Sequence, residues 1–422
     1  MKKIFSFFKL LGPGLVTGAS DDDPSGIATY SQAGAQFGYQ QLWILLFTTP
    51  FMVVIQEMCG RIGMVTGCGV AGVIRRHYAK PILYIILVIL SLANIINIGA
   101  DIAAMAQSIQ LLLQVSFIFW MFLIAGISAL LEIVIPYKTY AKYLKYTSFV
   151  LFAYVITALI VKENWHQILQ EIIAPRLSLQ SDYLLNIVAI LGTTISPYLF
   201  FWQSNEEVEE RIEQNRQKDL DRKTGYTTKK DLFALRFDTL AGMIFSNLVS
   251  FFIIMTAAAT LGMHGKLQIN TAAQAAQALK PFAGNFAFLL FTIGIVSSGL
   301  LAVPVLAGSL SYAIAETFQW KAGLGKKPTR APVFYGIIAG ATILGLLTTF
   351  SPVAPFRLLY YSAALNGITA VPLMVIILLI ANNKKIMKEH SNSRWSTILG
   401  WCITGCMGAA SILLLANLKN SS

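Results

Sequence analysis

Charged residues are scarce in this chain. Asp, Glu, Lys and Arg make up 12% of its 422 residues, whereas 56% of the residues are hydrophobic, and the mean hydropathy is +0.64. Soluble globular domains carry about twice that share of charge, because their surfaces face water. The composition therefore excludes a soluble domain and predicts an all-α polytopic membrane protein.

Residues that support redox or soft-metal chemistry are also few. The chain has 4 Cys and 4 His; the cysteines lie in or beside apolar segments and are interpreted as small buried hydrophobic residues. The histidines are scattered, without an H-E-x-x-H arrangement, and there is no C-x-x-C. A P-loop, a G-x-S-x-G elbow and a Rossmann fingerprint are missing as well. We therefore expect no enzymatic activity and no bound cofactor.

Long apolar runs fill most of the chain. A helix needs about 20 apolar residues to cross the hydrocarbon core of a bilayer. Eleven segments qualify, with approximate limits of 10–37, 40–64, 81–113, 117–135, 144–161, 183–203, 239–262, 281–316, 332–350, 355–381 and 396–417. No cleavage site follows the basic start of the chain, so we expect the first span to be retained.

The net charge of +12 has a simple interpretation in the distribution of the basic residues. Most Lys and Arg lie in segments on the same predicted side as the N-terminus, including the mixed-charge segment 206–236. By the positive-inside rule, the N-terminus is cytoplasmic and the C-terminus lies outside. We expect 206–236 to be a cytoplasmic loop with a helical start, and we expect no nucleic-acid partner.

The spans divide into two groups of five and one further helix, within a single transmembrane domain over residues 1–422. Repeat 1 covers about 10–161, repeat 2 about 183–381, and the additional helix about 396–417. The first span of each group is interrupted by polar residues around a proline. An odd number of spans per repeat inverts the second repeat, and paired broken helices at the substrate site are typical of secondary transporters.

The two interruptions are Asp21-Asp22-Asp23-Pro24-Ser25-Gly26 and Thr193-Thr194-Ile195-Ser196-Pro197-Tyr198. A proline inside a helix removes a backbone hydrogen bond and frees carbonyl groups. A carboxylate beside free carbonyls suits Mg²⁺, Mn²⁺ or Ca²⁺. We place Asp23 in such a site, whereas Asp21 and Asp22 also suit helix caps at a membrane interface.

Further polar residues lie inside other spans. The third span contains Asn94, Asn97, Asp101 and Ser108. These residues fall near one helical face, which predicts a cavity or pathway. A fixed ion pair of Asp101 with a buried basic residue is an alternative. Glu57 and Glu132 could act as relays, but Glu57 precedes Arg61 by one helical turn and equally predicts a structural pair. Asn366 could orient a water on a bound ion or bond a neighbouring helix.

Five motifs stand out along the chain, namely Gly12-Pro13-Gly14, Asp23-Pro24-Ser25-Gly26, Gln32 to Gly38, Ala100-Asp101-Ile102-Ala103 and Gly192 to Pro197. With these motifs the chain resembles the Nramp divalent-metal transporters. The resemblance implies a LeuT-type fold of two inverted five-helix repeats plus an eleventh helix, with helices 1 and 6 unwound at the midplane. It also implies a metal site between those two helices.

The chain departs from the family pattern at the positions that would bind metal and protons. Gly26 stands where Mn²⁺ and Fe²⁺ transporters of the family have Asn, Ser196 replaces a Met, and Tyr198 replaces a His. Gln203 stands at a second His position, and Ala104 replaces a third-span Glu. Losing the thioether removes a preference for softer metals, and Gly26 in place of Asn is expected to widen the site. The pattern resembles the Nramp-related magnesium transporters.

This resemblance implies an importer of hydrated divalent cations, preferably Mg²⁺, that works by alternating access with weak or no proton coupling. The residues expected at the metal are Asp23, Ser20, Gly26, Thr193, Ser196, Tyr198 and Asn366. Those expected along the ion pathway are Asp101, Asp22, Glu57, Asn97 and Gln203. We expect a monomer in the inner or plasma membrane.

Three other functions remain open at this point. One is a proton-coupled Mn²⁺ or Fe²⁺ importer that uses Asp21 or Asp22 as a substitute ligand and proton acceptor. Another is a Na⁺-coupled carrier of organic solutes on the same fold. The third is an intramembrane protease with Asp23 and Asp101 as its aspartate pair, although no companion G-x-G-D motif occurs.

Overall fold

The computed structural model describes residues 13–135, 148–161, 165–213, 227–264 and 268–421. These residues form helices and their connections, and none of them lies in a β-strand. The longer helices are α2 (Pro13–Asp21), α3 (Pro24–Phe37), α4 (Leu42–Thr66), α6 (Lys80–Gln110), α7 (Phe117–Val134), α9 (Phe152–Ile160), α11 (Ser181–Thr194), α12 (Pro197–Glu213), α13 (Lys229–Thr260), α16 (Ala287–Phe318), α17 (Pro332–Thr348), α18 (Pro355–Asn382) and α20 (Arg394–Ser421).

Short helices connect the long ones. The α-helical pieces are α5 (Val70–His77), α10 (Trp165–Ile173), α14 (Ala272–Ala276), α15 (Lys280–Ala283) and α19 (Lys384–Met387). The 3₁₀ turns are η1 (Ser148–Leu151), η2 (Gly262–His264), η3 (Gln277–Leu279), η4 (Gly284–Phe286), η5 (Pro328–Arg330) and η6 (Lys388–His390).

The helices account for the predicted spans. In the described part of the chain, 8 helical segments are long and apolar enough to cross a membrane, with α11 and α12 taken together as one of them. The segments Phe149–Ile160 and Pro332–Thr348 are apolar but shorter, and α2 with α3 forms the interrupted first span. Residues 10–12 and 144–147 of the predicted spans lie outside the described residues.

The predicted loop over 206–236 is wrong in its extent. Helix α12 continues to Glu213 and α13 already begins at Lys229, while residues 214–226 lie outside the described part. A capping box explains the early start of α13, because the Thr228 side chain accepts from the backbone of Asp231 and the Asp231 side chain accepts from Thr228. The mixed charge that predicted a loop lies largely on two helix ends.

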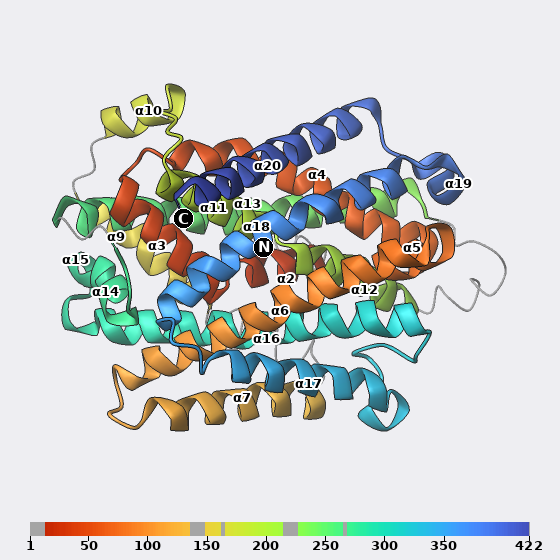
Figure 1. Ribbon diagram of the computed structural model, residues 1–422, viewed down its shortest axis with the longest axis horizontal. Coiled ribbons are helices and arrows are strands. Elements are labelled where there is room, and N and C mark those ends of the chain that lie inside the picture. Colours follow the sequence, from red (N-terminus) through yellow and green to blue (C-terminus); the bar gives the residue numbers. More distant parts are fainter. Residues whose placement is uncertain (1–12, 136–147, 162–164, 214–226, 265–267, 422) are drawn as a thin grey trace, which may run out of the picture.

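The broken helices occupy the middle of the bundle. Both α2 and α3 pack on α13, α3 also contacts α11 and α18, and α2 also contacts α12 and α16. Helices α6, α16, α17 and α7 lie side by side along the lower edge of Figure 1, and α20 packs on α11 and α18 at the opposite edge. The two breaks are thus surrounded by other helices, where unpaired backbone groups can be satisfied.

Small residues bring the central helices into backbone contact. A Cβ atom on Gly192 of α11 would overlap the carbonyl oxygen of Ala363 and the backbone of Gly367 on α18. A Cβ atom on Gly18 of α2 would overlap Gly242 of α13 in the same way. Close helix approach through small residues is typical of membrane bundles, in which lipid supplies no hydrophobic drive between helices.

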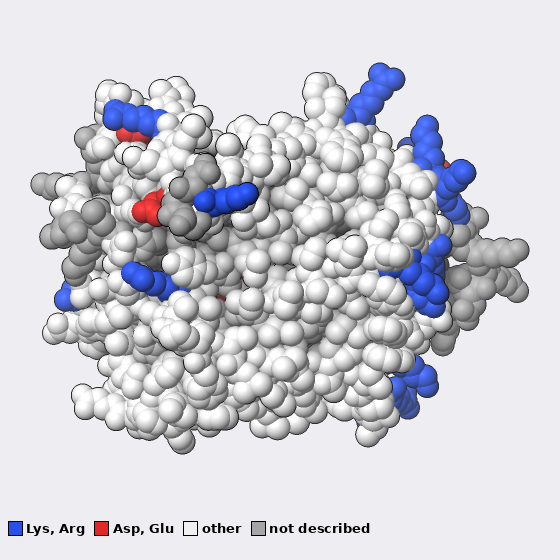
Figure 2. Space-filling view, viewed as in Figure 1, with Lys and Arg blue, Asp and Glu red and all other residues white. Residues whose placement is uncertain are grey.

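The outer surface matches a membrane environment. Figure 2 shows Lys and Arg gathered at the two ends of the molecule, more of them at the right-hand end, and a wide middle belt almost free of charge. Large apolar side chains of α6 and α7 are exposed as well, such as Ile85 at 59% and Leu130 at 61%. The chain is a multi-pass membrane protein, as the composition predicts.

Candidate metal site

The break between α2 and α3 places one carboxylate at the start of a helix. Asp23 is the N-cap of α3 with φ −70° and ψ 170°, and Pro24 follows at the first helical position. An N-cap acid satisfies free backbone N–H groups, and proline fits the next position because its missing N–H is not needed there. Asp23 Oδ1 accepts from the Gly26 N–H at 2.7 Å and from Ser25 Oγ at 2.6 Å.

The break between α11 and α12 is built without charge. Helix α11 ends at Thr194, and Pro197 opens α12. The Ser196 hydroxyl lies 3.0 Å from the Gly192 carbonyl oxygen and 2.9 Å from that of Thr193, so it caps the end of α11. A hydroxyl that donates its single proton keeps two acceptor lone pairs. Ser196 can therefore stabilise the helix end and still offer oxygen to a cation.

The two breaks meet in the centre of the molecule. The Tyr198 hydroxyl donates to the carbonyl oxygen of Ser20 at 3.2 Å, which joins α12 to α2. A Cβ atom on Gly26 would lie 2.9 Å from Thr193 Oγ1, so α3 also approaches the end of α11. These contacts join the two breaks and involve five of the predicted ligand positions, namely Ser20, Gly26, Thr193, Ser196 and Tyr198.

The contact at Gly26 changes one part of the sequence interpretation. Gly26 in place of a larger residue was expected to widen the site. The space that a side chain would fill is instead bounded by Thr193 Oγ1 and by Tyr30 Cε2, which would lie 3.3 Å from the added Cβ. The glycine permits close packing of α3 on the end of α11, and the prediction of extra room at this position is wrong.

Asn97 of α6 contacts Asp23 directly. Its Nδ2 donates to Asp23 Oδ2 at 3.1 Å, and its Oδ1 accepts from Ser362 Oγ of α18 at 2.8 Å. The serine fixes the orientation of the amide, so that the N–H side faces the carboxylate. Asn97, expected along the pathway, therefore belongs to the surroundings of Asp23, and both oxygens of this buried carboxylate have donors.

Two other predicted residues are buried with few polar contacts. Asp101 is 0% exposed, and within the described part of the chain neither of its oxygens has a partner at hydrogen-bond distance and angle, although the Ser25 backbone lies nearby. Asn366 is 1% exposed, and neither of its amide atoms has one; its neighbour Gly367 packs on the end of α11. Asp23 lies within electrostatic reach of Asp101. Buried polar atoms without partners are rare in proteins and indicate a place for water or an ion.

Asp21 and Asp22 face a different helix from Asp23. Ser246 Oγ of α13 lies 2.8 Å from Asp21 Oδ2 and 3.2 Å from Asp22 Oδ1, and Ser250 Oγ lies 3.2 Å from Asp22 Oδ1. Both carboxylates are buried, so the interpretation as caps at an exposed interface is wrong. The three consecutive aspartates therefore diverge, and only Asp23 contacts Asn97.

Gln203 lies on α12 beyond the second break and connects it to α2. Its Oε1 accepts from Thr17 Oγ1 at 2.5 Å, and its Nε2 donates to Glu207 Oε1 at 3.0 Å. Asp238 of α13 accepts from the Gly14 N–H at 2.6 Å and lies within electrostatic reach of Glu207. The sequence interpretation missed Glu207 and Asp238, because one fell in the predicted loop and the other just beyond it.

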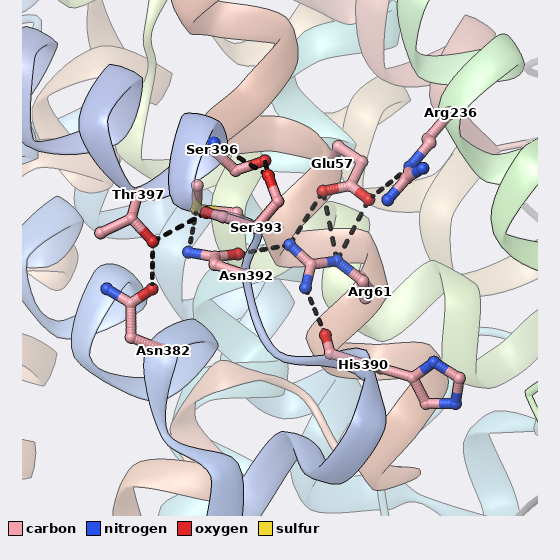
Figure 3. A network of polar contacts seen from close by, with 10 residues as sticks. Glu57, Arg61, Arg236, Asn382, His390, Asn392, Ser393, Ser396 and Thr397 are labelled. Atoms are coloured by element: carbon pink, nitrogen blue, oxygen red, sulfur yellow. Dashed lines mark hydrogen bonds and ion pairs between the residues drawn. The ribbon is translucent and has the colours of Figure 1, made fainter.

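Glu57 is part of an ion-pair network. Glu57 pairs with Arg61 at 3.0 Å and with Arg236 of α13 at 3.1 Å, and the Arg61 guanidinium also donates to the His390 carbonyl and to Asn392 Oδ1 (Figure 3). The network ties α4 to α13 and to the segment before α20. This placement agrees with the structural alternative for Glu57, and its role in an ion pathway stays a prediction.

A cavity of about 220 Å³ lies beside α3, α11 and α18. Its lining includes Ala28, Gln32 and Gln36 of α3, together with Asp182 and Arg357. The α3 residues lie on successive turns that lead away from Asp23, so the cavity follows the helix that Asp23 caps. Neither Gln32 nor Asp182 was predicted as a site residue. For Gln32 a signal was available, because its spacing from Pro24 places both on one face of the helix.

The predicted ligand positions at the two breaks offer oxygen atoms: the Asp23 carboxylate, neutral hydroxyls and backbone carbonyls. The described part of the chain holds no group of three or more His, Cys, Asp and Glu suited to a metal. One carboxylate with neutral oxygens suits a hard cation that keeps part of its water shell.

Glu132, which was predicted as a possible relay, is buried in α7, and neither of its oxygens has a hydrogen-bond partner among the described residues.

The arrangement of helices is that of solved transporters. A manganese transporter of Eremococcus coleocola superimposes with a TM-score of 0.72 at 18% identity, covering 98% of this chain and 88% of that one. Mhp1, a nucleobase-cation-symport-1 family transporter, superimposes with a TM-score of 0.55 at 12% identity, covering 97% and 92%. These similarities confirm the predicted LeuT-type fold with unwound first and sixth spans.

The family follows from the sequence itself. The family described as "Natural resistance-associated macrophage protein-like" (Nramp) matches residues 14–417, and the chain therefore belongs to the Nramp family. It is 26% identical over 403 residues to the divalent metal cation transporter MntH of Klebsiella pneumoniae (strain 342), covering 93% of this chain and 90% of the relative. The resemblance read from the first span is confirmed at the level of the family.

Proposed function

We propose that this protein transports divalent metal cations across the membrane by alternating access, with Asp23 as the charged ligand. The observation that carries the proposal is the buried Asp23 carboxylate at the meeting point of two helix breaks, held by Ser25, Gly26 and Asn97. The orphaned amide of Asn366 and the orphaned carboxylate of Asp101 add hydrogen-bonding groups for a hydrated ion. The name of the MntH relative supports the same class of substrate.

Binding calorimetry on the purified full chain tests this proposal. Mg²⁺ and Mn²⁺ should bind the wild type, and Asp23→Asn should abolish binding at the Asp23 site, because the amide removes the charge of the proposed ligand. Glu171→Gln is a matched control, since Glu171 is a buried carboxylate on the peripheral helix α10. Unchanged affinity in Asp23→Asn would contradict the proposal.

We further propose that the site accepts hard cations and favours Mg²⁺. Ser196 caps the end of α11 where other members of the family would offer a sulfur, so nothing in the α11–α12 break selects for softer metals. Mg²⁺ is held by one or two carboxylates with several retained waters. The inside-negative membrane potential supplies about 2.3 kcal/mol per elementary charge per 100 mV for inward movement.

The second candidate is proton-coupled import of Mn²⁺ or Fe²⁺. The names of related proteins favour it, because the superimposed Eremococcus coleocola structure is a manganese transporter. It predicts that Mn²⁺ entering proteoliposomes acidifies their interior, whereas uncoupled Mg²⁺ or Mn²⁺ entry leaves the internal pH unchanged. A pH-sensitive dye inside the vesicles separates the two candidates.

We also propose that the N-terminus is cytoplasmic and the C-terminus is outside. We propose further that the protein has no enzymatic activity and that the transporting unit is a monomer. The similarity to Mhp1 is one of fold, and the oxygen ligands around Asp23 favour a metal ion over an organic solute. Cysteine labelling from either side of intact cells, with Cys402 and Cys406 replaced beforehand, tests the orientation.

A further inference from the structure

A second group of acids lies on the opposite side of the first helix break from Asn97. Asp21 is 0% exposed and Asp22 is 2% exposed, and both carboxylates face Ser246 of α13. Ser250, one turn further along α13, also contacts Asp22 at 3.2 Å. Two neighbouring carboxylates therefore share two hydroxyl groups in the interior of a membrane protein.

No positively charged side chain in the described part of the chain pairs with these buried carboxylates. Neither Asp21 nor Asp22 forms an ion pair within the described part of the chain, and Asp21 Oδ1 has no hydrogen-bond partner. Buried carboxylates in proteins are paired, coordinate a metal or take up a proton, because an isolated ionised carboxylate in a low-dielectric interior is very costly. Two neutral serines do not balance two acids.

Tyr30 gives an independent indication that a ligand belongs here. It is 0% exposed, and among the described residues its hydroxyl has no partner at hydrogen-bond distance and angle. Its ring edge lies against Gly26, and its hydroxyl lies close to Ser250 and Thr193 and within electrostatic reach of Asp21 and Asp22. The hydroxyl therefore belongs to the same polar group, and a buried donor and acceptor without a partner calls for a bound species.

The potential ligands of this group are all hard oxygens. They are two carboxylates, two serine hydroxyls and one phenol oxygen. They come from α2, α3, α13 and Asp22, which lies in the break between α2 and α3. Such a set suits a divalent cation of the Mg²⁺ and Ca²⁺ type, and its two negative charges match the charge of that ion. Asp23 is not part of this set, because in the described part of the chain its carboxylate hydrogen bonds run to Ser25, Gly26 and Asn97 and none of them reaches Ser246 or Ser250.

We propose that Asp21, Asp22, Tyr30, Ser246 and Ser250 form a second site for a hard divalent cation, separate from the Asp23 site. Two ions at neighbouring sites repel each other, and such repulsion helps an ion to leave a pathway in which it would otherwise bind too tightly. The inference rests on the proposed function only for the class of ion, and it holds whichever divalent metal is transported.

Metal stoichiometry tests the second site. Purified full-length protein is dialysed to equilibrium in Na⁺-free buffer with saturating Mg²⁺, and the bound ions are counted by mass spectrometry of the metal. We expect two ions per wild-type chain, one in Asp22→Asn, one in Asp23→Asn and none in the double variant. One ion in the wild type, or two in Asp22→Asn, would overturn the proposal.

Milder variants protect the test against misfolding. Ser246→Ala and Ser250→Ala each remove one neutral ligand and should weaken the second site by about three- to tenfold, while the Asp23 site keeps its affinity. Ser298→Ala is the matched control, because Ser298 is a buried membrane serine that bonds only the Ile295 carbonyl. Loss of binding in Asp23→Asn alone reports on the proposed function, so the two proposals fail separately.

Discussion

The two helix breaks end a helix inside the membrane by different chemistry. At the α2–α3 break, an acid caps the new helix, and Asp23 receives donors from Ser25, Gly26 and Asn97. At the α11–α12 break, the Ser196 hydroxyl caps the carbonyls of the old helix. The comparison shows that the geometry of a break and its ligand chemistry are separate, since one break supplies the charge and the other supplies neutral oxygens.

Removing the charge from the first break should have the largest effect. Asp23→Asn should lower divalent-metal uptake by about 100-fold or more, because affinity in oxygen sites depends on the number of charged ligands. Isotope or dye uptake into proteoliposomes measures this. Glu171→Gln should transport normally, and an equal loss in that control would point to a general defect.

Filling the space between the breaks should have the next largest effect. A side chain at Gly26 would begin 2.9 Å from Thr193 Oγ1, and overpacking of this kind costs about 1–3 kcal/mol. Gly26→Asn should therefore reduce uptake by about tenfold or more, measured as initial rates. Adding Thr193→Ala should restore part of the rate, and absence of any rescue would show that the close contact is not the cause.

Giving the second break a sulfur should change selectivity. Ser196→Met should raise the preference for Mn²⁺ over Mg²⁺ by about tenfold, because a thioether favours softer metals. The measurement is competition between the two ions during uptake. Ser196→Ala removes the hydroxyl without adding sulfur and serves as the control. If both variants shifted selectivity equally, the cap and not the sulfur would be responsible.

Loosening the support of Asp23 should have a smaller effect. Asn97→Ala removes one donor from the carboxylate, and the loss of one charge-assisted hydrogen bond corresponds to about 1.5–3 kcal/mol. Some of this is recovered when water replaces the amide, so we expect a several-fold rise in KM with little change in the maximal rate. Ser362→Ala, which acts through Asn97, should show a weaker change in the same direction.

Changes outside the breaks should leave transport intact. Glu57→Gln removes the charge that holds buried Arg61 and should lower stability by about 3 kcal/mol, seen as a lower unfolding temperature. Its effect on uptake per folded molecule should be slight. A loss of uptake comparable with that of Asp23→Asn would restore Glu57 to the ion pathway.

Much of the fold and the centre of the site could be predicted from the sequence. Apolar length predicts the spans, and proline beside polar residues predicts both breaks, because these signals are local. The partners of the acids could not be predicted in this way. Asn97 meets Asp23, Ser246 meets Asp21, and Arg236 meets Glu57 across long sequence separations. Those contacts depend on how the helices pack.

The errors have the same origin. Glu207 was missed because a charged helix end resembles a loop in composition, although Gln203 contacts it in the next helical turn. The expectation of a wider site at Gly26 considered one helix alone, whereas Thr193 from the other break takes up the space. Local patterns predict elements reliably, but they do not predict what each element meets.

Mg²⁺ uptake into proteoliposomes under an inside-negative potential tests whether the Asp23 site carries hard divalent cations. We expect robust Mg²⁺ entry through the wild type and no entry through Asp23→Asn. Excess Mg²⁺ should inhibit Mn²⁺ entry, because both ions use the same oxygen ligands. Strong Mn²⁺ transport that millimolar Mg²⁺ leaves unaffected would contradict the account.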